Sequence, residues 1–111
     1  MYNDVKTFIE ACDQERNTEN VILYHNLIKE EYQEYLDAIE PTDDLDACMD
    51  MIWVILGYCY MQGWDVEGAW KEVARSNLDK IDPETKKVIK NENGKVMKPD
   101  GWKPPELKSF V

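Results

Sequence analysis

The sequence predicts an all-α fold, a four-helix bundle followed by a short extended or hairpin-like C-terminal arm. Turn and cap signals divide the first eighty residues into four helical segments, and several prolines exclude a helix from the tail. A chain of 111 residues supports one hydrophobic core and not two. We therefore expect a single domain over residues 1–111, with the bundle over 1–81 and the arm over 82–111.

The first two predicted helices span about Asn3–Gln14 and Glu19–Glu40. Thr18 is a suitable N-cap for the second helix, because its side-chain oxygen can accept a hydrogen bond from a free backbone N–H. Pro41 cannot continue that helix, since proline lacks the N–H that the helix interior requires.

The third predicted helix follows Thr42, as its N-cap, and ends at Gly63, a residue type common just after helix C-termini. Its segment Ala47–Met61 is almost entirely apolar but shorter than the roughly 20 residues that a bilayer requires. This pattern predicts a buried core helix. The fourth helix is predicted over Asp65–Lys80.

The remaining residues predict an extended arm. Asp82-Pro83 breaks the helical pattern, and Asn93-Gly94 predicts a turn between two short extended runs, 87–90 and 95–98. Prolines on both sides of Trp102 exclude a helix or a central strand from the tail.

Charge and cysteine content limit the partners and the compartment. The net charge of -10 repels nucleic-acid backbones and anionic membrane surfaces, so we expect neither as a partner. The 3 cysteines cannot all pair within one chain, and none has a zinc-site spacing. Because the N-terminus also lacks the pattern of a signal peptide, we expect a reducing, cytoplasmic location.

Two glutamates interrupt the apolar face of the second predicted helix. At about 100° per residue, Glu31 and Glu34 lie between Leu27 and Ala38 on that face, with Glu30 at its edge. Two inward carboxylates one turn apart repel each other and lose hydration, which costs several kcal/mol unless a cation compensates.

The third predicted helix provides carboxylates to match. Asp50 is the only charged residue between Ala47 and Trp64, and Asp46 and Asp50 lie on one acidic stripe. A short connection would place this helix antiparallel to the second, so that the two acidic rows face each other. Such an all-oxygen cluster suits Mg²⁺, or Mn²⁺, rather than Zn²⁺. The alternative is that Asp50 pairs with a lysine of the fourth helix.

The motif Glu30-Glu31-x-x-Glu34, followed by a stripe ending at Asp50, resembles the E-E-x-x-E and E-x-x-D pattern of the MazG-like all-α nucleoside triphosphate pyrophosphohydrolases. Asn77 and Lys80 are similar to the N-x-x-K element of this superfamily, and the proline-containing tail resembles that of its short phage and bacterial members. One departure is clear. The glutamate expected three residues before Asp50 is Ala47, and Asp46 is a candidate to take its place.

The resemblance implies Mg²⁺-dependent hydrolysis of the α–β phosphoanhydride of a nucleoside triphosphate. It implies a role for each residue of the motifs. Glu30 would orient or deprotonate the attacking water, Lys80 would pair with phosphate, and Asn77 would hydrogen-bond the nucleotide. The implied metal ligands are Glu31, Glu34, Asp50 and Asp46.

Two other functions stay open at this point. One is phosphoribosyl-ATP hydrolysis within the same enzyme class, and the other is a non-catalytic, metal-binding interaction domain. A di-iron bundle needs two E-x-x-H motifs, whereas the chain has 1 histidine. Because the third helix is apolar on both sides, we expect a homodimer or a dimer of dimers.

Overall fold

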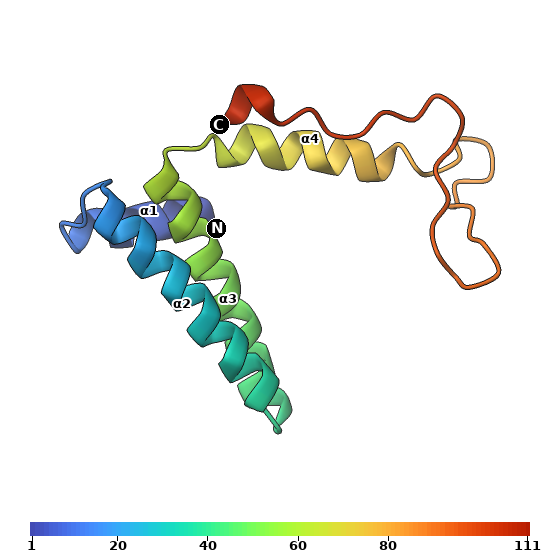
Figure 1. Cartoon of the computed structure of the whole chain (residues 1–111). Helices are drawn as coiled ribbons and strands as arrows, with labels where there is room; N and C mark the ends of the chain where they lie inside the picture. Colours follow the sequence, from blue (N-terminus) through green and yellow to red (C-terminus); the bar gives the residue numbers. More distant parts are fainter. The chain divides into compact units, whose positions relative to one another are not determined.

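The computed structural model describes all 111 residues, and the chain divides into two compact units. The first unit consists of residues 1–66 together with Val111, and the second of residues 67–110. The structure contains four α-helices, one short 3-10 helix and no sheet (Figure 1). The predicted all-α class is therefore confirmed.

Helix α1, Tyr2–Ala11, begins the first unit and buries Val5 and Ile9. It ends before the predicted Gln14 because Asp13 adopts a left-handed conformation with φ 55°. The N–H groups of Asp13 and Gln14 then donate to the carbonyls of Glu10 and Ile9. This pair of hydrogen bonds is a Schellman motif, which satisfies the last helix carbonyls and stops the helix.

Helix α2, Thr18–Asp37, begins one residue earlier than predicted. Its N-cap is Asn17 rather than Thr18, since the extended Asn17 accepts a hydrogen bond from the Asn20 N–H at 2.8 Å. The helix also ends earlier than the predicted Glu40. Ala38 is already extended, with ψ 134°, and Glu40 is held extended by the proline that follows it.

Helix α3, Pro41–Gln62, has Glu40 at its N-cap position, so the predicted capping by Thr42 is wrong. Pro41 occupies the first turn, where its fixed φ and missing N–H suit the start of a helix. Gly63 ends the helix with φ 74°, as predicted. None of the four helices is both long and apolar enough to cross a membrane.

Helices α2 and α3 lie side by side and antiparallel (Figure 1). The ring of Tyr24, which is 3% exposed, lies directly against Gly57, where a Cβ atom would come within 2.3 Å of it. The hydroxyl of Tyr24 donates to Gln14 Oε1 at 2.8 Å. The contact between Tyr24 and Gly57 fixes the register of the two helices. The core around it consists of Val5, Ile9, Tyr24, Val54 and Met61.

Only part of α3 is buried within the chain, in contrast to the predicted core helix. Its fully buried residues are Ala47, Val54, Gly57 and Met61. Other apolar side chains of the helix are exposed, among them Leu45, Met49, Ile52 and Ile55.

The second unit combines α4, Val66–Leu78, with the extended arm and the 3-10 helix η1, Lys108–Phe110. Helix α4 ends before the predicted Lys80 because the chain turns into an antiparallel bridge between Ile81 and Val88. A second bridge joins Lys90 to Val96 across a turn in which Gly94 has φ 78°. The hairpin predicted at Asn93-Gly94 is therefore present.

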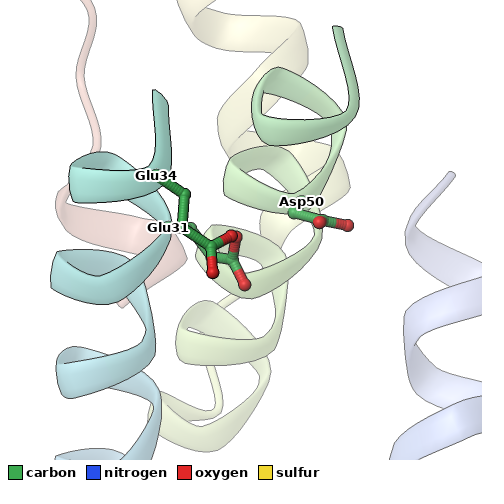
Figure 2. A group of neighbouring side chains, drawn as sticks. All are labelled: Glu31, Glu34 and Asp50. Atoms are coloured by element: carbon green, nitrogen blue, oxygen red, sulfur yellow. The ribbon is translucent and has the colours of Figure 1, made fainter. Parts of the chain in front are cut away.

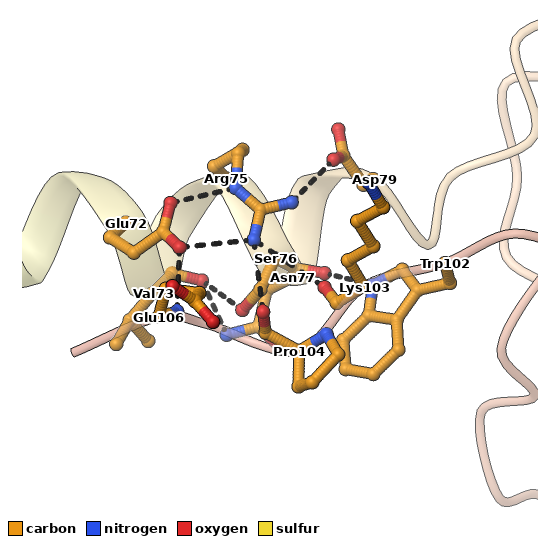
Figure 3. A network of polar contacts seen from close by, with 10 residues as sticks. All are labelled: Glu72, Val73, Arg75, Ser76, Asn77, Asp79, Trp102, Lys103, Pro104 and Glu106. Atoms are coloured by element: carbon orange, nitrogen blue, oxygen red, sulfur yellow. Dashed lines mark hydrogen bonds and ion pairs between the residues drawn. The ribbon is translucent and has the colours of Figure 1, made fainter. Parts of the chain in front are cut away.

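Arg75 ties the arm to α4 (Figure 3). Its guanidinium donates to Glu72 on the same helix, to Asp79 in the turn that follows it, and to the carbonyls of Lys103 and Pro104 in the arm. The Trp102 indole N–H donates to the Ser76 carbonyl at 2.6 Å. These contacts hold in place a proline-rich segment that can form neither an α-helix nor the regular backbone hydrogen bonds of a β-sheet.

Candidate metal centre

Three carboxylates of α2 and α3 lie close to one another (Figure 2). Glu31 and Glu34 come from α2 and Asp50 from α3, and each provides an oxygen within 4.8 Å of the others. The sequence predicted this grouping, but Glu34 is exposed rather than turned inward as predicted.

The helix geometry explains why these three residues meet. Glu31 and Glu34 are one turn apart and therefore share a face of α2. The Tyr24–Gly57 contact sets the antiparallel register, and seven residues along α2 and seven back along α3 lead to Glu31 and Asp50. The same packing that buries the tyrosine thus places the carboxylates opposite each other.

Glu31 has the most unusual environment of the three. Its Oε2 atom is buried and has no hydrogen-bond partner. Loss of hydration, the largest cause, acts together with a hydrogen bond with Glu34 and with the charges of Glu34, Asp50 and Glu30 to raise the pKa of Glu31 to about 7. Loss of hydration also raises the pKa of Asp50, together with the charges of Asp46 and Glu34.

This environment fits a bound cation. No lysine or arginine of the first unit forms an ion pair with the three carboxylates. A buried carboxylate oxygen without a donor is costly in the metal-free state, and a divalent ion removes that cost. Because all of the donors are oxygens, the set suits Mg²⁺ or Mn²⁺.

Glu30 and Asp46 flank this cluster and are both exposed. Glu30 precedes Glu31 in α2 and raises its pKa by charge repulsion. Asp46 has the corresponding effect on Asp50, but it is not one of the three residues whose oxygens gather within 4.8 Å. Its neighbour Ala47 is 3% exposed.

Asn77 and Lys80 belong to the second unit and contact each other there. The Lys80 ammonium donates to Asn77 Oδ1 at 3.0 Å, and the Asn77 amide donates to the Val73 carbonyl at 3.2 Å. Lys80 also lies over the Trp102 ring, 5.2 Å from its centroid. The two residues of the N-x-x-K element therefore form one polar group, in the unit that does not contain the carboxylates.

The family comparison adds an independent observation. The family model for phosphoribosyl-ATP pyrophosphohydrolase matches residues 3–77. The chain belongs to this family. It is part of the MazG-like all-α superfamily that the motifs resemble, and membership identifies the chain as a pyrophosphohydrolase that acts on a nucleotide. No curated protein matches the chain.

The residues that match the phosphoribosyl-ATP pyrophosphohydrolase family include all of α1 except Tyr2, and all of α2 and α3. They therefore include the three clustered carboxylates. Lys80 and the arm follow the matched segment.

Two features of the second unit were not predicted from the sequence. One is the network around Arg75, which the spacing of Glu72, Arg75 and Asp79, three and four residues apart within the predicted fourth helix, could have indicated. The other is the contact of Lys98 with the face of Trp102, 4.8 Å from the ring centroid. No sequence pattern predicts this contact, since it depends on how the arm folds.

Proposed function

We propose that the chain is a Mg²⁺-dependent pyrophosphohydrolase that cleaves the α–β phosphoanhydride of a nucleoside or deoxynucleoside triphosphate. The products are a nucleoside monophosphate and pyrophosphate. The buried Glu31 oxygen, unpaired among three carboxylates within 4.8 Å, is the observation that supports this proposal best. Membership in a nucleotide pyrophosphohydrolase family supports the reaction type.

A cation is necessary because both partners are negatively charged. The chain carries a net charge of -10, and a triphosphate would be repelled by the carboxylates without one. In our proposal Glu31, Glu34 and Asp50 hold Mg²⁺, and Asp46 adds negative charge beside them. The ion would neutralise the charge that develops on the phosphate oxygens.

The other residues act on water and on the nucleotide. Glu30 is exposed at the edge of the cluster, where its carboxylate can orient the attacking water and accept a proton from it. As the oxygen of water bonds to phosphorus, the P–O bond of the α–β anhydride breaks. The nucleoside monophosphate and pyrophosphate then separate. Lys80 contributes a positive charge for a phosphate group, and Asn77 contributes amide hydrogen bonds to the nucleotide.

The test is pyrophosphate release from a panel of ribo- and deoxynucleoside triphosphates, with Mg²⁺ and with EDTA. We expect turnover of at least one member of the panel with Mg²⁺ and none with EDTA. Glu31→Gln, which keeps the shape of the side chain, should lose most of the activity. A folded protein that releases no pyrophosphate from any nucleotide would instead favour the non-catalytic, metal-binding domain.

Phosphoribosyl-ATP is the second candidate substrate, and the description of the matching family favours it. Its reaction involves the same phosphoanhydride chemistry, so the carboxylate cluster serves both proposals equally. The same panel should therefore include phosphoribosyl-ATP. A kcat/KM for this substrate more than about tenfold above that of every simple triphosphate would replace our first proposal with the second.

A further inference from the structure

We propose that Lys98 is a second phosphate-binding residue, which acts with Lys80 on the phosphate chain of a nucleotide, and that Trp102 positions both lysines. All three residues belong to the second unit. The choice of a nucleotide as the ligand rests on the proposed function. The site itself does not, because it contains none of the clustered carboxylates.

The stretch from Lys80 to Lys103 is the basic part of an acidic chain. It contains seven lysines and four aspartates or glutamates, although the whole chain carries a net charge of -10. A local excess of positive charge attracts anions, whereas the rest of such a chain repels them. An anionic ligand is therefore drawn to this stretch rather than to the remainder of the surface.

Trp102 brings two of these lysines together. The Lys80 ammonium lies over the indole ring, 5.2 Å from its centroid, and the Lys98 ammonium lies over the same ring, 4.8 Å from the centroid. Cation–π attraction stabilises each contact, but it neutralises neither charge. Two like charges at one ring repel each other, and a bound anion would offset that repulsion.

Neither lysine has a carboxylate partner within the chain. No ion pair includes Lys80 or Lys98. Asp79, which precedes Lys80, pairs instead with Arg75 at 2.9 Å, and Asp100 also forms no ion pair with either lysine. The negative charge that balances the two ammonium groups must therefore come from the solvent or from a ligand.

Both ammonium groups retain donors for a ligand. Each ammonium has three N–H donors, of which Lys80 gives one to Asn77 Oδ1 at 3.0 Å. The donors that remain can form charge-assisted hydrogen bonds with phosphate oxygens. Because two separate ammonium groups can contact different phosphates of one chain, the pair suits a polyphosphate better than a single phosphate.

The Trp102 ring is itself fixed to α4. Its indole N–H donates to the Ser76 carbonyl at 2.6 Å (Figure 3), and its backbone N–H donates to the Pro99 carbonyl at 3.1 Å. The turn closed by the second bond contains Gly101 with φ 77°, a conformation that favours glycine. These bonds hold the ring where both lysines contact it, so Trp102 acts as a positioning residue.

The experiment titrates the full-length chain with inorganic tripolyphosphate, by calorimetry, after a chelating resin has removed divalent ions. We expect binding without metal, and tighter binding than that of inorganic phosphate. Lys98→Gln should weaken tripolyphosphate binding at least about fivefold, and Lys98→Arg should retain most of it. Lys90→Gln, the same change at an exposed lysine of the hairpin, is the matched control and should weaken binding less than about twofold.

Trp102 is tested by two substitutions. Trp102→Phe keeps a ring face without the indole N–H, and Trp102→Leu removes both. The phenylalanine variant should retain part of the affinity that the leucine variant loses. In the nucleotide assay, Lys98→Gln should raise KM by about the same factor and change kcat less, because it removes binding common to the ground and transition states.

The lysine variants decide the proposal whether or not Trp102→Leu folds. A wild type that binds no tripolyphosphate, or binds inorganic phosphate equally well, would overturn the inference. Equal losses in Lys98→Gln and Lys90→Gln would overturn it too. Mg²⁺-dependent pyrophosphate release by the same protein would still leave the proposed function intact. Conversely, binding that depends on Lys98 in a protein that hydrolyses no nucleotide would uphold the phosphate site and remove the proposed function.

Discussion

At the scale of single residues, the titration of Glu31 links the candidate metal centre to stability. In the metal-free protein, loss of hydration and neighbouring carboxylates raise its pKa from 4.5 to about 7. Between these values the folded protein retains a proton that the unfolded chain has released. The contribution of this group to the stability of the metal-free protein should therefore be complete at and below pH 4.5, fall as the pH rises to about 7, and then level off.

Urea unfolding in EDTA across this pH range measures the effect. Glu31→Gln carries no titrating group at this position, so its stability should change less with pH than that of the wild type. Stability of the wild type that rises steadily from pH 4.5 to 7 would contradict the environment described for Glu31.

Asp50 allows the metal-ligand role to be separated from an ion-pair role. Asp50→Asn keeps the shape of the side chain and its hydrogen-bonding capacity while it removes the charge. We expect Mg²⁺ to raise the melting temperature of the wild type, because the ion binds the folded cluster. Asp50→Asn should lose most of this increase and most Mg²⁺-dependent turnover. Its metal-free stability should hold or rise, because a repulsion has been removed.

The measurements are pyrophosphate release and thermal unfolding with and without Mg²⁺, with Glu34→Gln in parallel. If Asp50 instead neutralised a buried lysine, the same substitution would destabilise the metal-free protein by roughly 3–5 kcal/mol. Mg²⁺-dependent turnover that persists in either variant would remove that residue from the proposed site.

The sequence predicted the cluster of three carboxylates but not the positions of the residues beside it. Glu31, Glu34 and Asp50 are recognisable because a charge within an apolar helix face is unusual without a partner. That Asp46 does not join the three residues whose oxygens lie within 4.8 Å of one another depends on side-chain positions in the folded helices. The contact of Lys80 with Trp102 likewise depends on the folded arm.

At the scale of helices, one close contact sets the geometry of the site. A Cβ at position 57 would lie 2.3 Å from Tyr24 Cε1, and the ring is 3% exposed. Gly57→Ala should therefore destabilise the fold by about 1–3 kcal/mol, although alanine is the better helix former. Because the helices must shift, Mn²⁺ affinity should fall as well.

Chemical denaturation of Gly57→Ala and calorimetry with Mn²⁺ test both effects. Tyr24→Leu provides the background for a double-mutant comparison, since a smaller side chain leaves space for the new methyl group. The extra cost of Gly57→Ala should shrink in that background. Equal costs in the two backgrounds would show that the glycine serves another purpose.

The presence and approximate position of each helix were predictable from the sequence, whereas the exact residues at which the helices begin and end were not. Hydrophobic periodicity, Pro41 and Gly63 identify the number and order of the helices. The choice of Asn17 over Thr18 as the α2 cap could not be predicted, because both side chains can accept the same hydrogen bond. The end of α1 depends on a left-handed Asp13, a conformation that aspartate adopts only in suitable surroundings.

At the scale of the whole molecule, the chain exposes a large amount of apolar surface. Only six hydrophobic side chains are fully buried: Val5, Ile9, Tyr24, Ala47, Val54 and Met61. Along α3, Leu45 is 61% exposed and Met49 50% exposed. A monomeric protein rarely exposes so many neighbouring apolar side chains, and self-association through matching surfaces is the common solution. We therefore propose a homodimer or a dimer of dimers.

A charge on this surface should dissociate the assembly. Leu45→Glu places a carboxylate where a second copy would pack, and burial of that charge without a partner opposes association. Because Leu45 is 61% exposed in the single chain, the substitution should leave each chain folded. Ile89→Glu, at a residue 58% exposed in the arm, is the matched control.

Light scattering should give a multiple of 13.1 kDa for the wild type and the control, and a smaller assembly for Leu45→Glu. A wild type that scatters as a 13.1 kDa monomer at micromolar concentration would exclude the assembly.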